Sequence, residues 1–322
     1  MDKSATSINM GKIKSFDNEA SKKGALYYLK RDWQLYALLF PGVIFYLLFR
    51  YLPMYGVVIA FKDYGIYTGI LKSPWAGFKH FTAFFSSDDF IMLFKNTFLL
   101  GFFNILWSFP APVMFAILLN EVRHNIFKKF VQTASYLPSF LSTVVVSSMV
   151  IDLISPGNGM INNIIAALGF EKQYFLIMPE WFRTIYISSD IWQFMGYNAI
   201  IYISALTMID SALYDAAKID GCGRLKSIWH VTLPGILPTI ATMFIIKSGS
   251  MFKIGFEKVL LLYTPTTYVT ADVFSTFVYR KGLLETNYSY ATAVGLFESL
   301  VALAIILISN AISKRMTEQS II

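Results

Sequence analysis

The chain has 322 residues, of which 56% are hydrophobic and only 15% are charged. A soluble domain usually carries about 25% charged residues, and here the apolar residues also form repeated runs of the roughly 17 to 25 residues that cross a bilayer. The formal net charge of +7 would suggest nucleic acid binding in a soluble protein, but membrane proteins also accumulate Lys and Arg on their cytoplasmic side. Composition therefore excludes an ordinary soluble domain and predicts an all-α integral membrane protein that binds no nucleic acid.

Six apolar segments follow one another along the chain and predict six transmembrane helices. The spans are expected at approximately 33–61, 91–119, 131–154, 184–209, 235–254 and 290–312. They make one transmembrane domain, 33–313, between an N-terminal segment, 1–32, and a tail, 314–322. Lys and Arg are concentrated in 1–32 and in the segments after the second, fourth and sixth spans, so both termini are predicted to be cytoplasmic.

The segment 155–183, between the third and fourth spans, is expected on the outer side of the membrane. It begins with residues that favour turns, Pro156 to Gly159, and continues with an apolar stretch from Met160 to Phe170. This order predicts a turn followed by a short helix at the membrane interface.

The segment 211–234, between the fourth and fifth spans, is the most informative part of the sequence. Residues at i, i+3, i+4 and i+7 share one face of a helix, and here they are Leu213, Ala216, Ala217 and Asp220. Gly221 and Gly223 then interrupt the helix.

A second short amphipathic helix is expected to follow these glycines and to present Leu225, Ile228 and Trp229. Leu233-Pro234 is expected where the chain re-enters the membrane, because proline is tolerated in the first turn of a helix. The unit is a cytoplasmic helix-turn-helix that suits docking into the groove of a partner. The residues alone equally allow an ordinary loop that packs on its own bundle.

A resemblance to a known family distinguishes these readings. The pattern Asp215-Ala216-Ala217, three residues, Gly221, and then Leu233-Pro234 resembles the EAA loop of binding-protein-dependent ABC import permeases. Asp215 replaces the usual Glu and keeps its charge. The extension from Ala217 to Gly221 and the second proline, Pro238, are similar to the carbohydrate branch of that family.

Further motifs extend the resemblance over about 90–320. Permeases for oligosaccharide uptake have similar residues at the positions Asn96-Thr97, Tyr136-Leu137-Pro138, Trp192, Tyr197-Asn198, Gly255-Phe256-Glu257, Leu261-Leu262-Tyr263, Thr276 to Arg280 and Gly295-Leu296-Phe297. These motifs favour the branch that handles complex oligosaccharides, including those from plant or algal polysaccharides.

The resemblance implies a type I ABC importer permease in the cytoplasmic membrane of a bacterium. It implies four kinds of partner: a second, homologous permease, two ATP-binding subunits, an extracytoplasmic solute-binding protein, and the oligosaccharide itself. The chain has no G-x-x-x-x-G-K-[ST] motif, so ATP hydrolysis is assigned to the partners, and neither catalysis nor a cofactor is expected here. The residues expected to couple this chain to an ATPase are Leu213, Tyr214, Asp215, Ala216, Ala217, Asp220, Gly221, Leu225, Leu233 and Pro234.

The substrate path is predicted from polar, ionisable and aromatic residues inside the spans. Ionisable residues in spans tend to face cavities, and aromatic faces together with fixed hydrogen-bonding groups suit sugars. The predicted path comprises Lys95, Trp192, Gln193, Tyr197, Asn198, Lys247 and Met251. Trp192 and Tyr197 could instead anchor the chain at the membrane interface, and Lys247 could snorkel toward it. Together with Lys253, the path lysines would suit an oligosaccharide of uronic acids.

Three alternatives remain from the sequence. A secondary transporter would need its own coupling carboxylates at mid-membrane and usually internal repeats. A membrane enzyme would need clustered acid-base residues, but Asp88-Asp89 is typical of a helix start. The lone Cys222 has only His230 nearby as a candidate partner for a catalytic thiol. The EAA loop alone would also allow an ABC permease for peptides.

Overall fold

The structure is a computed structural model that describes residue 27 and residues 30–317. The predicted N-terminal segment, 1–32, and the predicted tail, 314–322, therefore lie largely outside the described residues. The chain divides into two compact units, Met1–Val58 and Ile59–Ile322, and each is described by itself.

The described part of the first unit is a helix that is apolar on every side. It comprises α3 (Trp33–Tyr46), the π-helical turn η1 (Leu47–Tyr51) and α4 (Leu52–Met54), and it continues into the 3₁₀ segment η2 (Tyr55–Phe61). No residue of α3, η1 or α4 is buried. A helix that is hydrophobic all round needs an apolar environment, which a membrane provides.

The second unit is built from helices. In residues 59–317 the only extended pairing is an isolated bridge between Lys62 and Trp75. Its elements after η2 are α5 (Gly69–Lys72), α6 (Lys79–Phe85), α7 (Asp88–Ser108), α8 (Pro110–Asn120), α9 (Asn125–Tyr136), η3 (Leu137–Phe140), α10 (Thr143–Ile154), α11 (Met160–Ala167), η4 (Phe175–Ile177), α12 (Pro179–Thr207), α13 (Ser211–Ile219), α14 (Arg224–Ser227), η5 (Ile228–Thr232), α15 (Leu233–Gly249), α16 (Phe256–Leu262), η6 (Pro265–Thr267), α17 (Tyr268–Ala271), α18 (Phe274–Tyr279), η7 (Arg280–Leu284) and α19 (Tyr288–Thr317).

Up to six segments of the described chain are long and apolar enough to cross a membrane. Four are single runs of helix: Trp33–Phe61, Asp88–Asn120, Arg224–Gly249 and Tyr288–Ala311. Two more are bent pairs, Asn125–Phe140 with Thr143–Ile154 at 105° and Pro179–Thr207 with Ser211–Ile219 at 70°. The predicted all-α membrane fold is confirmed.

Two spans differ from the prediction. The predicted span 131–154 is broken, because the 3₁₀ turn η3 begins at Leu137-Pro138 and Ser142 then caps α10 by accepting a hydrogen bond from the Val145 amide at 3.3 Å. The predicted second inner helix and the fifth span are one continuous helix, Arg224–Gly249. The π turn η5 precedes Pro234 and accommodates its missing amide hydrogen. This helix ends at Gly249, before the predicted end at 254.

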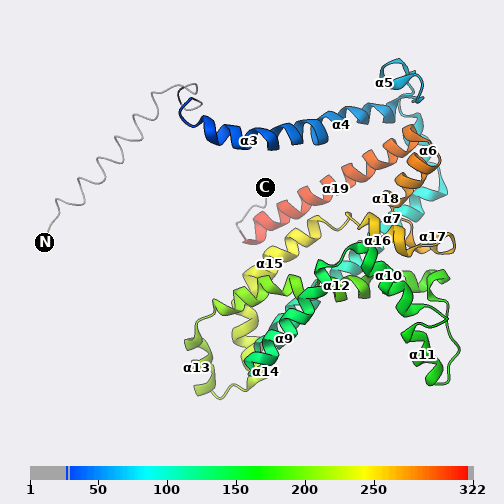
Figure 1. Ribbon diagram of the computed structural model, residues 1–322. Coiled ribbons are helices and arrows are strands. Elements are labelled where there is room, and N and C mark those ends of the chain that lie inside the picture. Colours follow the sequence, from blue (N-terminus) through cyan, green and yellow to red (C-terminus); the bar gives the residue numbers. More distant parts are fainter. Residues whose placement is uncertain (1–26, 28–29, 318–322) are drawn as a thin grey trace. The chain divides into compact units, whose positions relative to one another are not determined.

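Helix α12 lies at the centre of the second unit, against α7, α8, α9 and α15. One cluster of buried side chains joins α7, α12, α16 and α17 and includes Leu100, Phe182 and Val259. A second cluster is formed largely by phenylalanines around Phe84 and Phe274. Figure 1 shows α13 at the turn between α12 and α14, away from these clusters.

Candidate functional site

The helix-turn-helix formed by α13 and α14 has a capped start and a glycine-dependent end. The Asp210 side chain accepts a hydrogen bond from the Ala212 amide at 2.9 Å, which caps α13. At the other end the amide of Gly221 donates to the Lys218 carbonyl at 3.1 Å, and the amide of Cys222 donates to the Ala217 carbonyl at 2.8 Å. Gly221 has φ = +73°. This is a Schellman motif, whose left-handed position favours glycine because it has no Cβ.

One face of α13 packs on the rest of the chain, and the other faces stay exposed. Ala217 is buried, and the hydroxyl groups of Tyr214 and Thr232 are hydrogen-bonded at 3.1 Å. Leu213 is 54% exposed, and Ala216 and Asp220 are exposed as well. The predicted common face of Leu213, Ala216, Ala217 and Asp220 is therefore divided, because Ala217 is buried and the other three are exposed.

The remaining predicted coupling residues lie around this helix. The Asp215 carboxylate pairs with the Lys218 ammonium at 2.9 Å on an exposed surface, so the pair contributes little stability and Asp215 stays accessible. Leu225 is 76% exposed. Leu233 is half-buried and Pro234 is exposed at the start of α15. An accessible helix with apolar and acidic side chains can dock into a groove.

A polar cavity of about 170 Å³ lies between α7, α12 and the end of α15. Lys247 and Met251 of the predicted path line it, together with Asn104, Asp190 and Lys253. A cavity with two ammonium groups and a hydrogen-bonding amide can hold an anionic or hydroxyl-rich ligand.

A buried ion pair adjoins this cavity. The Lys258 ammonium lies 3.6 Å from the Asp190 carboxylate and 3.5 Å from the Gln193 side-chain oxygen. The Asn104 amide donates to the other Asp190 oxygen at 3.0 Å. Lys258 is 4% exposed and belongs to α16, outside the spanning helices. Burial lowers the pKa of its ammonium, and the Asp190 carboxylate opposes part of that shift.

The structure separates the other residues of the predicted path. Trp192 lines a different, apolar groove. Tyr197 and Asn198 are exposed on α12, and Lys95 is exposed on α7. Only Lys247, Met251 and, through Lys258, Gln193 are brought to the polar cavity. Sequence reasoning missed Lys258 as a site residue because it lies in what reads as an outer loop. The signal in the sequence was the pair Asp190 and Gln193, which lie one helical turn apart inside a span. Polar side chains at such positions require a charged or hydrogen-bonding partner.

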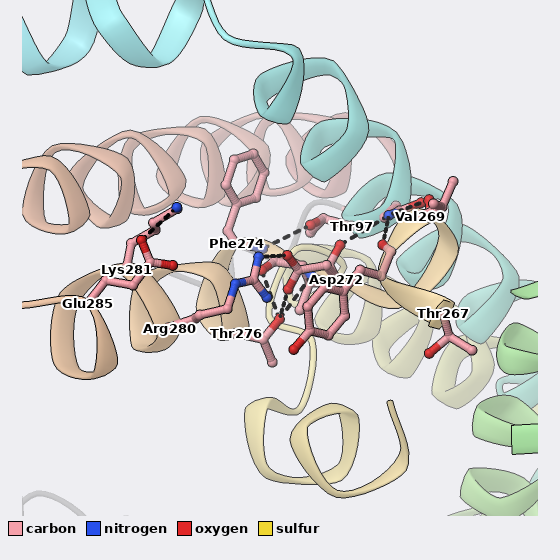
Figure 2. A network of polar contacts seen from close by, with 12 residues as sticks. Thr97, Thr267, Val269, Asp272, Phe274, Thr276, Arg280, Lys281 and Glu285 are labelled. Atoms are coloured by element: carbon pink, nitrogen blue, oxygen red, sulfur yellow. Dashed lines mark hydrogen bonds and ion pairs between the residues drawn. The ribbon is translucent and has the colours of Figure 1, made fainter. Parts of the chain in front are cut away.

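A second buried network ties α17 and α18 to α7 and α12 (Figure 2). The Asp272 side chain is fully buried, accepts from the Thr276 hydroxyl at 2.7 Å and pairs with the Arg280 guanidinium. Burial alone would lower the pKa of Arg280, but the hydrogen bond and charge of Asp272 outweigh burial and raise it. The Asn96 amide donates to the Asp272 carbonyl at 3.2 Å and accepts from Arg183 at 3.0 Å. This network holds α17 and α18 against α7 and α12.

The residues that the structure describes contain no group of three or more His, Cys, Asp or Glu side chains that could hold a metal ion.

Comparison with known proteins identifies the family. The family described as "Binding-protein-dependent transport system inner membrane component" matches residues 92–318. The chain belongs to this family. The family predicted from the inner loop and its flanking motifs is therefore confirmed.

Several relatives of this transport component align over almost their full length. The "Polygalacturonan/rhamnogalacturonan transport system permease protein YteP" of Bacillus subtilis (strain 168) is 45% identical over 300 residues, which cover 93% of this chain and 94% of YteP. "Protein LplB" of the same organism is 42% identical over 293 residues, which cover 91% of this chain and 92% of LplB.

Solved structures of related transport components show the same fold. A chain of a bacterial ABC transporter involved in the import of the acidic polysaccharide alginate superimposes with a TM-score of 0.82 at 46% identity, over 90% of this chain and 98% of that one. A chain of a bacterial alginate ABC transporter in complex with an alginate pentasaccharide-bound periplasmic protein superimposes with a TM-score of 0.84 at 44% identity. The match covers 93% of this chain and 100% of that one.

Proposed function

We propose that this chain is one permease subunit of an ATP-driven bacterial importer, and that its substrates are oligosaccharides containing uronic acids. The observation that carries the proposal is a polar cavity with excess positive charge, in a chain whose relatives include transporters named for acidic polysaccharides. YteP is named for polygalacturonan and rhamnogalacturonan, and the solved transporters are named for alginate.

The charges at the cavity favour an anionic substrate. Asp190 is neutralised by Lys258. Lys247 and Lys253 also line the cavity, and within residues 30–317 neither has a carboxylate partner. Two uncompensated ammonium groups favour a ligand that brings its own carboxylates, because a charge-assisted hydrogen bond contributes about 1.5–3 kcal/mol.

Coupling to ATP is assigned to α13 and its turn. ATP would close a pair of partner ATPase subunits, one docked on the exposed side of α13 and the other on the corresponding loop of a second, homologous permease. Because α13 is joined to α12 on one side and to the helix Arg224–Gly249 on the other, a displacement of α13 moves two spans together. Rocking of these spans gives alternating access.

The proposed topology places both termini and α13 in the cytoplasm and α11 outside, where an extracytoplasmic binding protein delivers the sugar. The greater density of Lys and Arg on the side of α13 supports this orientation.

The test uses the importer assembled with its second permease and ATPases in liposomes, with the binding protein supplied. Uptake of a galacturonate oligosaccharide is compared with uptake of a neutral oligosaccharide of equal length, with and without ATP. We expect ATP-dependent uptake of the acidic sugar. A preference for the neutral sugar would overturn the substrate class, and uptake driven by an ion gradient alone would overturn the importer class.

Two substitutions locate the selectivity. Lys253→Met should lower acidic-sugar uptake about tenfold, which corresponds to ~1.4 kcal/mol for one lost charge-assisted bond, and should leave neutral-sugar uptake unchanged. Lys95→Met is the matched control, because this lysine is exposed on α7 away from the cavity. If the two variants lower acidic-sugar uptake equally, the cavity is not part of the substrate path.

A further inference from the structure

Helix α9 exposes cations and large apolar side chains on the same surface. Ile126, Phe127 and Phe130 are each more than half exposed. Arg123, just before the helix, and Lys129 are exposed as well. No residue of α9 is buried. A basic helix with aromatic and aliphatic side chains suits the interface of a membrane, where part of its surroundings is apolar and part is charged.

The positive charge of this segment is not balanced within the chain. Residues 121–130 contain three Lys or Arg residues and one Glu, and no acidic residue follows until Asp152. Within residues 30–317 neither Arg123 nor Lys129 pairs with a carboxylate. By contrast, the segment 210–230, which is proposed to dock an ATPase, contains three acidic and three basic residues. The partner of α9 is therefore expected to be anionic.

The contact between α9 and α12 fixes the depth of this surface in the proposed topology. Gly196 of α12 lies against the Ser135 carbonyl of α9 and leaves no room for a Cβ. From Gly196 to Thr207, the inner end of α12, the distance is about 16 Å at 1.5 Å per residue. Lys129 precedes Ser135 in the same helix and lies about 9 Å closer to the inner side.

These distances place the cations at the inner boundary of the hydrocarbon core. Helix α12 has 29 residues and is about 43 Å long, which matches a bilayer with its headgroups, about 40–45 Å. Gly196 then lies about 5 Å below the midplane, and Lys129 about 14 Å below it, where a core about 30 Å thick ends. Phe130 lies just inside the core, and Arg123 lies farther out, among the headgroups.

The exposed surface of α9 continues toward the middle of the membrane with largely apolar side chains. Leu137 and Phe140 are strongly exposed, and Thr133 and Ala134, between them and Phe130, are exposed as well. Cations, then aromatic and then aliphatic side chains follow the change of polarity in one leaflet, from headgroups to acyl chains. A soluble ATPase subunit would match the cations but could not cover the part inside the core.

We propose that the exposed surface of α9 binds an anionic phospholipid of the inner leaflet. Arg123 and Lys129 supply the charge for the headgroup, and Phe127 and Phe130 contact the upper part of the acyl chains. The bound lipid anchors the inner half of the third span, which is broken after α9. The inference rests on the proposed topology and does not depend on which sugar is carried.

The test is photo-crosslinking in the complete importer, reconstituted in phosphatidylcholine vesicles. A trace of phosphatidylglycerol that carries a diazirine near the ester end of one acyl chain is added, and the crosslinked residues are mapped by mass spectrometry. Phosphatidylcholine with the same diazirine is the neutral probe. We expect residues 123–130 to crosslink several-fold more strongly to phosphatidylglycerol than to the neutral probe.

Matched substitutions assign this selectivity to charge. Arg123→Gln and Lys129→Gln should each lower phosphatidylglycerol crosslinking about fivefold, and the double variant should bring it close to the level of the neutral probe. Lys129→Arg keeps the charge and should keep the crosslinks. Lys72→Gln removes an exposed lysine of α5, on the outer side in the proposed topology, and should change nothing.

Several outcomes would overturn the proposal: equal crosslinking of the two lipids at 123–130, unchanged crosslinking in the double variant, an equal loss in Lys72→Gln, or crosslinks from this segment to the second permease in place of lipid. If the double variant does not assemble, judged by size-exclusion chromatography, Lys129→Gln alone gives the same test with a smaller change. Labelling of Cys222 by a membrane-impermeant maleimide in intact spheroplasts would separately overturn the inner-leaflet assignment, whereas the sugar class is tested by uptake alone.

Discussion

Replacement of Gly221 by Ala tests the turn that ends α13. The free energy by which it destabilises the closed turn follows from the backbone conformation at this position. An added methyl at Gly221 would meet no atom within 4 Å, so the substitution creates no clash. Its cost is the left-handed conformation alone, φ = +73°, which is roughly 1–2 kcal/mol for a residue with a Cβ. The ratio of open to closed turn should then rise about 5- to 30-fold.

Gly223→Ala is a matched control two residues away. Gly223 has φ = −70° and ψ = 170°, which alanine adopts readily, and its Cβ would also meet nothing within 4 Å. A glycine-to-alanine change at a compatible position leaves stability equal or raises it by about 0.4–1 kcal/mol. The two variants therefore differ in backbone strain and hardly at all in chemistry.

Hydrogen exchange at the Cys222 amide is the direct readout, because this amide is bonded to the Ala217 carbonyl only when the turn is closed. Its exchange should be about 5- to 30-fold faster in Gly221→Ala and no faster in Gly223→Ala. If α13 is the coupling element, ATPase stimulation by the loaded binding protein should fall in the first variant only. Equal exchange in the two variants would refute the assignment of strain to Gly221.

Two further substitutions test the packing of the second unit. Asp272→Ala leaves the partly buried Arg280 guanidinium without its carboxylate and should destabilise the complex by about 1–3 kcal/mol, seen as a lower unfolding temperature in detergent. Lys281→Gln removes an exposed pair with Glu285 and should cost less than about 1 kcal/mol. A comparable loss in both would refute the burial argument. Gly196→Ala should lower the stability by about 1–3 kcal/mol and loosen α12 from α9, because the added methyl would overlap the backbone carbonyl of Ser135. An unchanged unfolding temperature would show that the two helices can separate freely.

The features that could be predicted from sequence depend on local residue patterns. The apolar runs predicted an all-α membrane chain, and Gly221 was expected to end the inner helix. The continuity of Arg224–Gly249 could not be predicted, because Pro234 normally marks a helix start and the π turn that accommodates it has no clear sequence pattern.

The polar sites were harder to predict because their partners are distant in sequence. Asp190 meets Lys258, and Asn96 meets Asp272. Lys95 and Lys247 looked equivalent as intramembrane lysines, yet only Lys247 reaches the cavity. Which side of a span faces a cavity depends on helix packing, and a helix that is apolar all round has no polar face in its sequence to indicate that side.

The Schellman turn has a practical consequence because it contains the chain's single cysteine. Cys222 is half-buried and unpaired, and it directly follows the left-handed glycine. A maleimide fluorophore would label this subunit at one position, without engineered thiols. The native sequence therefore supplies a labelling site at the proposed contact with the ATPase subunit. The emission of the dye would report changes in that contact during each cycle of ATP hydrolysis.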